Sequence, residues 1–373
     1  MKKIIFVIPS MASGGAEMKA IILLNYFFSS DYSPTLVLFK KEGVRFEEIP
    51  GGINIIDLKK KHRSDFFKLI IKLGLLLRKE KPYKVISFIE YSNVITLIAK
   101  IVFHIKCEVI INEESLPQHY LKITRFKYIK KFLMFFLYRK ADKIICGTEH
   151  LRDYICRNFR INKDRVIRIY NPINIERIHK LSKEKVNHPF LEKRKQGYKL
   201  IIAVGRLSKI KRYDVLLEAY AKIKKKIKAL LVILGEGDLL PQLIEMKNIL
   251  QLGANVDFVG YVSNPYAWIS KSDLLLMTSQ WEGFGNVIVE AMACETPVIS
   301  SKCPFGPIEI ISDGINGLLA PIGDAEETSR LAITLLKNNY LREKLRAEGK
   351  NRAEDFNIKI IGNEYKRMIE TCI

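Results

Sequence analysis

The sequence predicts an α/β protein of two domains, each built around a parallel β-sheet. Short apolar runs alternate along the chain with longer segments whose apolar residues recur at helical spacing. This alternation is typical of parallel sheets whose strands are joined by crossover helices. The chain has 373 residues, which is too long for one ordinary core, and its 48% hydrophobic content can fill two.

The first half contains seven runs that predict strands. The first, 4–8, follows Met-Lys-Lys and is too short for a signal peptide, so we interpret it as a buried strand. The segment 66–77 has helical spacing and separates the third strand from the fourth. The other predicted strands are 35–39, 53–58, 85–89, 109–111, 143–146 and 167–170.

The second half continues the same alternation. A proline-containing turn leads into the polar stretch 176–198, which we interpret as the link between the domains. The chain after the turn cluster 313–317 is expected to be helical to its end. Strands are predicted at 200–204, 230–234, 256–260, 274–277 and 297–300.

Positive charge is concentrated in the first half. The net charge is +22, and residues 1–190 hold 36 Lys and Arg against 18 Asp and Glu. Such a surface should seek an anionic partner: membrane phospholipid, a polyanionic acceptor or nucleic acid. Nucleic acid is disfavoured, because the sequence contains no recognised module to place the charges.

The stretch 122–143 interleaves eight basic residues with aromatic and aliphatic ones. That composition predicts a helix lying in a membrane interface. The alternative is a surface helix whose apolar stripe faces its own sheet. No segment reaches the ~18 uninterrupted apolar residues of a spanning helix, so attachment to a membrane would be peripheral.

The six cysteines are scattered along the chain, with neither zinc-site nor disulfide spacing. Scattered thiols in a chain without a recognisable leader indicate the reducing cytoplasm.

The strongest functional pattern is the stretch 278–292. An apolar strand runs into Trp-Glu-Gly-Phe-Gly, and Asn286 is predicted to cap the following helix. Backbone N–H groups at such a helix start form an anion site. Glu282 and Glu290 flank it, and carboxylates there are suited to accepting hydrogen bonds from sugar hydroxyls. The pattern therefore favours a nucleotide sugar, the alternative being the ordinary acidic bias of a helix start.

Three other loops follow predicted strands. Gly14 and Gly15 let the backbone approach a ligand closely, although an ordinary tight turn has the same pattern. Arg206 and Lys211 can both reach an anion, unless they belong to a solvated basic loop. Glu114 lies where a parallel strand ends and could contact an acceptor or donor, or simply be solvated.

In this order and spacing, the motifs resemble those of glycosyltransferase family 4, a family of retaining enzymes with the GT-B fold. The resemblance spans nearly the whole chain. The most similar members build bacterial surface glycans and include N-acetylgalactosamine transferases of lipid-linked oligosaccharide assembly. The motifs are Gly14-Gly15-Ala16-Glu17, Gly205-Arg206-Leu207 with Lys211, Gly235-Glu236-Gly237, and the stretch from Glu282 to Glu290.

The resemblance implies two Rossmann-like domains whose parallel sheets face each other across a cleft. Residues 1–175 would form the acceptor-binding domain and residues 176–354 the nucleotide-sugar-binding domain. The C-terminal helix, 355–373, would pack back on the first domain.

The resemblance also assigns roles to single residues. Arg206 and Lys211 would hold the donor diphosphate, Glu290 the ribose hydroxyls, and Glu282 the hydroxyls of the transferred sugar. The remaining donor-binding positions would be Gly14 and Gly15 in the first domain and Gly205, Gly260, Val262, Phe284, Gly285, Asn286 and Val287 in the second, with Gly260 and Val262 beside the base.

One position departs from the family pattern. Many relatives carry a histidine in the loop after the strand matching 109–111, where this chain has Glu113-Glu114, with His119 five residues beyond Glu114. Either Glu114 replaces the histidine in contacting the sugar, or the site is arranged differently.

The expected reaction is metal-independent transfer, with retention, of a sugar from a UDP-sugar to a lipid-linked or surface-glycan saccharide. N-Acetylhexosamine is the expected sugar, and no cofactor beyond the donor is expected. The chain lacks the Asp-x-Asp metal motif of many sugar-nucleotide enzymes. The expected location is the cytoplasmic face of the cell membrane, on an anionic surface. The alternatives are a GT-B-fold epimerase or phosphorylase, or a non-enzymatic basic membrane-binding protein.

Overall fold

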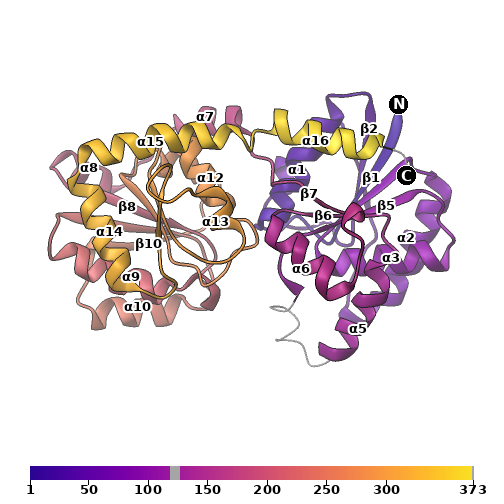
Figure 1. Cartoon of the computed structure of the whole chain (residues 1–373), viewed down its shortest axis with the longest axis horizontal. Coiled ribbons are helices and arrows are strands. Elements are labelled where there is room, and N and C mark those ends of the chain that lie inside the picture. The colour runs from indigo at the N-terminus through magenta and orange to yellow at the C-terminus, as the bar shows by residue number, and fades with distance from the viewer. Residues whose placement is uncertain (118–126, 372–373) are drawn as a thin grey trace. The chain divides into compact units, whose positions relative to one another are not determined.

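The computed structural model describes residues 1–117 and 127–371. His119 and the first part of the basic stretch, 122–126, lie outside the described residues. The chain forms two units, one made of Met1–Pro172 with Ile358–Ile373 and the other of Ile173–Asn357 (Figure 1). We call them unit 1 and unit 2 and describe each by itself.

Unit 1 is built on a parallel sheet with the strand order β3-β2-β1-β4-β5-β6-β7. All seven strands predicted for the first half are present. The strands are β1 (Lys2–Ile8), β2 (Tyr32–Leu38), β3 (Asn54–Asp57), β4 (Lys84–Phe88), β5 (Glu108–Glu113), β6 (Lys143–Cys146) and β7 (Val166–Arg168). The helices are α1 (Gly15–Phe28), α2 (Phe66–Glu80), α3 (Glu90–Val102), α5 (Lys127–Tyr138), α6 (Glu149–Phe159) and α16 (Ile358–Glu370).

The C-terminal helix α16 is part of the core of unit 1, where it packs against α1 (Figure 1). Ile361, Tyr365 and Ile369 are buried with the apolar residues of β1. The Tyr365 hydroxyl donates a 2.8 Å hydrogen bond to Oδ1 of Asn112 at the end of β5. Residues from the two ends of the chain therefore build one core.

Unit 2 has a second parallel sheet with the order β10-β9-β8-β11-β12-β13. The strands are β8 (Lys199–Val204), β9 (Ala229–Leu234), β10 (Val256–Gly260), β11 (Leu274–Met277), β12 (Val298–Ser301) and β13 (Leu318–Ala320). The helices are α7 (Ile175–Ser182), α8 (Pro189–Lys195), α9 (Tyr213–Lys224), α10 (Leu240–Ile249), α11 (Tyr266–Ile269), α12 (Asn286–Ala293), α13 (Gly306–Ile310), α14 (Ala325–Lys337) and α15 (Asn339–Glu354). The predicted α/β class with two parallel sheets is confirmed.

Two local predictions for this half are wrong. The stretch 176–198 does not link the two units, because it lies inside unit 2, where it forms most of α7 and all of α8. The Asn174 side chain caps α7 by accepting from the Arg177 N–H at 2.9 Å, and Ile175 and Ile178 bury one face of that helix. Residues 318–320 form the edge strand β13 and not a helix, since three residues are too few to show a helical or strand period.

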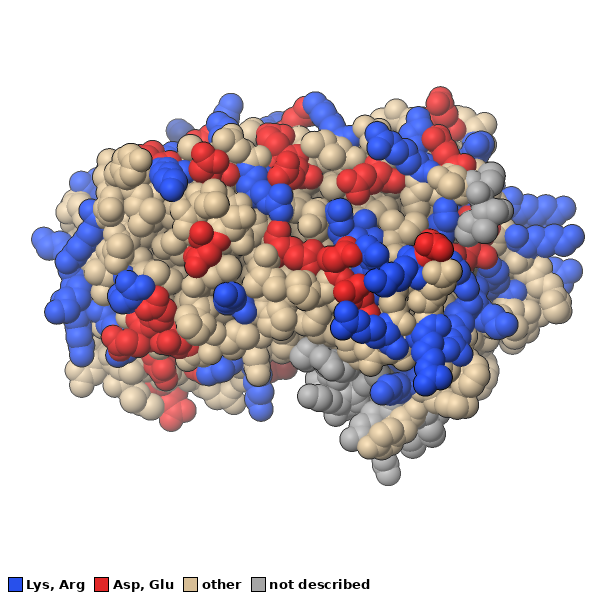
Figure 2. All heavy atoms as spheres, viewed as in Figure 1, with Lys and Arg blue, Asp and Glu red and all other residues tan. Residues whose placement is uncertain are grey.

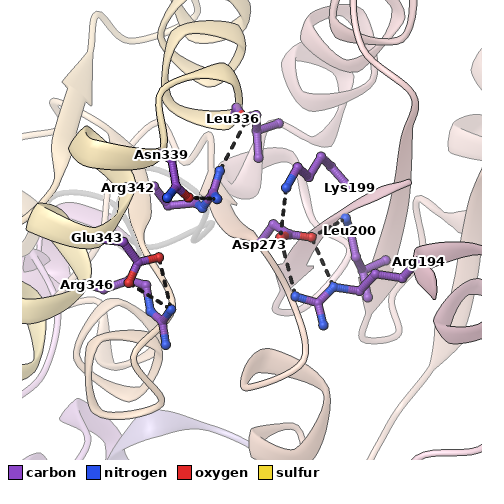
Figure 3. Close-up of polar contacts among 9 residues, drawn as sticks. All are labelled: Arg194, Lys199, Leu200, Asp273, Leu336, Asn339, Arg342, Glu343 and Arg346. Carbon is purple, nitrogen blue, oxygen red and sulfur yellow. Dashed lines mark hydrogen bonds and ion pairs between the residues drawn. The ribbon is translucent and has the colours of Figure 1, made fainter. Parts of the chain in front are cut away.

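A carboxylate fixes the amino ends of the two central strands of unit 2. Asp273 accepts from the Leu200 N–H at 2.9 Å and pairs with Arg194 at 3.2 Å and Lys199 at 3.7 Å (Figure 3). The Asp273 N–H in turn donates to the Leu200 carbonyl at 2.7 Å. The side chain therefore holds the starts of β8 and β11 together, at the end of the sheet opposite the carboxyl ends of these strands.

Candidate active site

The predicted donor-binding residues of unit 2 lie near the point where the order of its strands reverses. Strand β8 lies between β9 and β11, so the chain runs outward from β8 in one direction and from β11 in the other. The carboxyl ends of parallel strands at such a switch point are where open α/β sheets bind ligands. The loops carrying Arg206 with Lys211, and Glu282, both start there.

Lys211 and Glu282 form the central contact of this site. The Lys211 Nζ lies 2.5 Å from Oε1 of Glu282, and the two side chains are 23% and 12% exposed. The Ser279 hydroxyl donates to the same Oε1 at 2.6 Å. In the described structure no hydrogen bond is made to Oε2 of Glu282. The carboxylate therefore orients the ammonium and keeps one oxygen for a ligand hydroxyl.

The two loops are also tied together through the backbone. The Gln280 N–H donates to the Ile210 carbonyl at 2.7 Å, and the buried Thr278 hydroxyl donates to the Arg212 carbonyl at 2.9 Å. Arg206 is exposed at the rim of the first loop. The Lys211 ammonium is thus held in place, whereas the Arg206 guanidinium faces solvent.

Glycines allow the loops after β8 and β9 to approach closely. A Cβ on Gly235 would lie 2.0 Å from the Gly205 carbonyl oxygen, and a Cβ on Gly237 would lie 2.3 Å from that of Leu207. The Tyr213 hydroxyl, whose pKa is raised by burial, donates to the Gly205 carbonyl at 2.8 Å. Larger residues at these positions would push the Arg206 loop away from the sheet.

Helix α12 starts one residue earlier than predicted. Gly285, and not Asn286, is the N-cap, and it has a φ of +94°, which favours glycine. No side-chain hydrogen bond caps the helix, so its first-turn N–H groups are not covered by a capping side chain. Phe284 is buried edge-on against Phe356 at 5.5 Å between ring centroids and fixes the loop. Val287 follows in the first turn.

Glu290 is half-buried on α12, one turn into the helix, and the hydroxyl of the buried Tyr266 lies 3.5 Å from its Oε1. Gly260 ends β10 with a φ of +84°, and its carbonyl accepts from the Gly235 N–H at 2.7 Å. Val262 follows two residues later. Gly260 and Val262, at the end of β10, and Glu290, in the helix that follows β11, therefore lie near the carboxyl ends of the strands, as Lys211 does.

In unit 1, Gly14 and Gly15 start α1, with Gly14 as the N-cap. A Cβ on Gly14 would lie 2.4 Å from a carboxylate oxygen of Glu17. Glu114 is not the solvated residue that one alternative described. Its carboxylate lies 3.1 Å from the ammonium of Lys19, whose side chain on α1 is fully buried. The neighbouring Glu113 is buried too, and burial raises its pKa to about 8.

Sequence reasoning missed three residues that position the predicted ones. Ser279 contacts Glu282, Tyr266 contacts Glu290, and Lys19 pairs with Glu114. Ser279 could have been suspected, since it lies three residues before Glu282. Tyr266 and Lys19 carry no such signal, because they belong to other elements of the fold.

Within residues 1–117 and 127–371, no three or more His, Cys, Asp or Glu side chains are grouped to hold a metal ion. In the same ranges, no helix combines the length and apolar character needed to cross a bilayer.

Comparison with solved structures identifies the class of fold. The chain is similar to Anabaena HepE, whose crystal structure in complex with UDP-glucose superposes with a TM-score of 0.84, at 20% identity and with all of both chains covered. That structure and this one share the GT-B fold, two Rossmann-like domains with parallel sheets.

Family models identify the family. The model described as Glycosyltransferase Family 4 matches residues 13–177, and the model described as Glycosyl transferases group 1 matches residues 185–352. The chain therefore belongs to glycosyltransferase family 4, as the motifs predict, and it is a glycosyltransferase.

Two relatives from Campylobacter jejuni are similar over almost their whole length. One is the N-acetylgalactosamine-N,N'-diacetylbacillosaminyl-diphospho-undecaprenol 4-alpha-N-acetylgalactosaminyltransferase, 29% identical over 99% of this chain and 100% of the relative. The other is the GalNAc-alpha-(1->4)-GalNAc-alpha-(1->3)-diNAcBac-PP-undecaprenol alpha-1,4-N-acetyl-D-galactosaminyltransferase, 28% identical over 99% and 98%.

Proposed function

We propose that this glycosyltransferase moves an N-acetylhexosamine from a UDP-sugar to a lipid-linked saccharide, with retention of configuration and without a metal ion. The observation that carries the proposal is the arrangement of Lys211, Glu282 and Ser279 beside the first turn of α12. It offers a cation and backbone N–H groups to a diphosphate, and a carboxylate oxygen to sugar hydroxyls.

The residue roles follow from chemistry and position. Arg206 can make a forked contact to phosphate, and Lys211 supplies a fixed positive charge. Glu290, held by Tyr266, would accept from the ribose hydroxyls. UDP as the nucleotide is supported by Anabaena HepE, crystallised with UDP-glucose. N-Acetylhexosamine and a diphospho-polyprenol acceptor are supported by the two Campylobacter relatives, which act on such compounds.

In the proposed reaction, the bond between the anomeric carbon and the phosphate oxygen breaks as the acceptor oxygen bonds the same face of that carbon. The acceptor proton passes to the departing phosphate oxygen. Lys211 and Arg206 stabilise the charge that develops on the leaving diphosphate. Such preorganised electrostatic help is usually the largest catalytic contribution.

The membrane part of the proposal rests on α5, which has two apolar faces. Met134, Leu137 and Tyr138 are buried against the rest of unit 1. Tyr128, Phe132 and Phe136 recur every four residues and are exposed, with the Phe132 and Phe136 rings 4.5 Å apart. The helix thus packs on its own unit and still presents aromatic rings outward, which suits a bilayer interface.

The basic residues of α5 do not all face outward. The Lys130 ammonium lies 2.8 Å from a carboxylate oxygen of Glu90 on α3, whereas Lys131 is exposed. The structure does not describe the side chain of Lys127. We therefore propose that the exposed aromatic rings, with Lys131, attach the protein to the cytoplasmic face of an anionic membrane.

The decisive experiment is a transfer assay with a diphospho-polyprenol-linked saccharide and UDP-N-acetylgalactosamine, UDP-N-acetylglucosamine or UDP-glucose. An α-linked N-acetylhexosamine product, identified by NMR and formed equally with excess EDTA, is expected. A β-linked product would overturn retention, and loss of activity in EDTA would overturn metal independence. Tighter binding of GDP than of UDP in calorimetry would overturn the assigned nucleotide.

A further inference from the structure

A cavity of about 300 Å³ lies in unit 1 between the end of β3 and the first turns of α2. Five lysines line it, whereas Asp65 is its one acidic residue. The lysines are Lys59, Lys60, Lys61, Lys68 and Lys72. The cavity therefore carries a large excess of positive charge.

The single carboxylate of the cavity is already hydrogen-bonded to the backbone of its own loop. Asp65 accepts hydrogen bonds from the N–H groups of Lys61 and His62, at 2.8 and 2.9 Å. These bonds hold the pKa of Asp65 at about 2. The Lys68 ammonium lies 3.5 Å away from it. Asp65 thus shapes the loop and leaves most of the lysine charge for an external anion.

The lysines are placed by distinct contacts. The Lys72 ammonium donates to the Leu58 carbonyl at 2.6 Å, and the Lys60 ammonium lies 4.5 Å from the centre of the Tyr91 ring. Lys59 and Lys61 are exposed at the rim. Ammonium groups of this kind bind phosphate as point charges.

An apolar ridge runs along α2 beside this cavity. Phe67, Ile71 and Leu75 recur every four residues and are 74%, 50% and 57% exposed. Lys68 and Lys72 each follow one member of this ridge, so a lysine ridge lies alongside the apolar one. The opposite side of α2 is buried.

Exposed apolar residues also occur on the helix packed next to α2. A Cβ on Gly74 would lie 2.1 Å from the Phe103 ring, so α2 packs closely against the end of α3. Ile101 and Val102 are exposed there. Helix α3 also packs against α5. Figure 2 shows Lys and Arg side chains gathered over the unit that carries these helices. Three neighbouring helices, α2, α3 and α5, thus each offer exposed apolar residues, more than one hydrocarbon chain would contact.

We propose that the lysine-lined cavity binds the phosphate headgroup of an anionic membrane phospholipid while the Phe67–Leu75 ridge enters the bilayer interface. The breadth of the apolar surface favours a bilayer over a single lipid chain. Basic side chains beside an apolar ridge complement anionic headgroups above an acyl layer. The proposal rests on the membrane-bound acceptor proposed above and adds a specific headgroup site to it.

The test compares two variants that each lose two positive charges. Lys68→Ala with Lys72→Ala removes the cavity pair, and Lys225→Ala with Lys226→Ala removes an exposed pair in unit 2. Binding is measured by co-sedimentation with vesicles of equal parts phosphatidylglycerol and phosphatidylcholine. Each lysine near an anionic leaflet raises the membrane-binding constant about fivefold, so the cavity variant should bind about 30-fold more weakly. The control should bind like the unaltered protein.

Equal weakening of both variants would show that only net charge matters and would overturn the site. Strong binding to phosphatidylcholine vesicles containing polyprenyl diphosphate, but not to phosphatidylglycerol, would assign the cavity to the acceptor and overturn the phospholipid. If the double variant does not fold, Lys68→Ala alone should weaken binding about fivefold, because Lys68 is largely exposed. Normal vesicle binding by Lys68→Ala would also contradict the proposal.

A second variant tests the apolar ridge. Phe67→Ser with Ile71→Ser should reduce the binding that persists at high salt, because apolar insertion is not screened; the α5 rings account for the remainder. Transfer to a detergent-solubilised acceptor should be unchanged in all these variants. If the unaltered protein transfers no sugar to this acceptor, the proposed function is overturned. The vesicle assay would still test the headgroup site.

Discussion

Lys211 and Glu282 lie 2.5 Å apart, so each side chain fixes the position of the other. Ser279, which is fully buried, holds the carboxylate from a second side. A charge placed in this way loses little freedom when a diphosphate binds. The geometry also means that a change at one of these residues alters the others.

The first prediction concerns Lys211. Lys211→Ala should lower kcat/KM about ten- to 150-fold, because losing a charged hydrogen bond costs about 1.5–3 kcal/mol. Arg206→Ala and Glu290→Ala should each lower kcat/KM by a factor in the same range. The control is Lys209→Ala, an exposed lysine on the same turn. A comparable loss in that control would show that general loop charge, and not the Lys211–Glu282 contact, is responsible.

The second prediction concerns Glu113. Burial is the main cause of its raised pKa, about 8, and the charges of Glu90 and Glu114 add to it, while the Tyr138 hydroxyl opposes it. The folded protein therefore holds a proton that the unfolded chain releases above its ordinary pKa of 4.5. Hence this carboxyl makes the free energy of unfolding fall as pH rises from about 4.5 to 8.

Glu113→Gln should remove that fall, so its Tm should exceed that of the unaltered protein at pH 8 and approach it near pH 5. Thermal denaturation across this range measures the difference. Glu114→Gln is the matched control, because it leaves the buried Lys19 unpaired and should destabilise by about 3–5 kcal/mol at every pH. A Tm difference for Glu113→Gln that does not change with pH would refute the prediction.

At the scale of elements, α5 serves both the core and the surface. The third prediction is that Phe132→Ser with Phe136→Ser reduces the salt-resistant binding of anionic vesicles, because these rings are exposed. The fold should persist, since Met134, Leu137 and Tyr138 are untouched. Ile244→Ser with Ile249→Ser, on the exposed side of α10, is the control. Co-sedimentation at several salt concentrations measures binding; undiminished binding by the α5 variant would place the contact elsewhere.

The fourth prediction concerns the clamp on β8 and β11. Asp273→Asn removes the charge that pairs with Arg194 and Lys199 (Figure 3). It should lower the free energy of unfolding by about 1–3 kcal/mol, as measured in urea. UDP affinity should not change, since the clamp lies at the other end of the strands. Glu343→Gln, which breaks only the exposed pair with Arg346, should cost less than about 1 kcal/mol.

Strands were the most predictable elements of this chain. Buried parallel strands are continuous apolar runs, so twelve strands were visible in the sequence. Of the strands in residues 1–117 and 127–371, only β13, with three residues, was missed. Helices α7 and α8 were missed because polar residues dominate them, and their caps at Asn174 and His188 make little local pattern.

The candidate site was predictable only in part, for a related reason. Glu282, Glu290 and Lys211 lie in loops whose glycines and charges are visible in sequence. Tyr266 and Lys19 act through space from other elements, so only the fold reveals them. The two apolar faces of α5 could not be told apart from the sequence. A helical period shows that an apolar stripe exists, but not which stripe faces the core.

At the scale of the whole molecule, the two units do not follow one another along the chain, because unit 2 is inserted between the two segments of unit 1. Unit 2 is continuous, from Ile173 to Asn357, whereas unit 1 needs residues from both ends. The α16 residues Ile361, Tyr365 and Ile369 fill its core, and the Lys143 ammonium donates to the Met368 carbonyl at 2.8 Å.

This arrangement has a consequence for synthesis on the ribosome. Domains generally fold as units while the chain emerges, yet the portion made first here waits longest for completion. Until α16 has left the exit tunnel, the apolar residues of unit 1 that pack against α16 stay uncovered, although unit 2 can already be folded. A stop codon shortly before residue 358 would therefore spare the later-made unit and leave the earlier-made one exposed to chaperones and proteases.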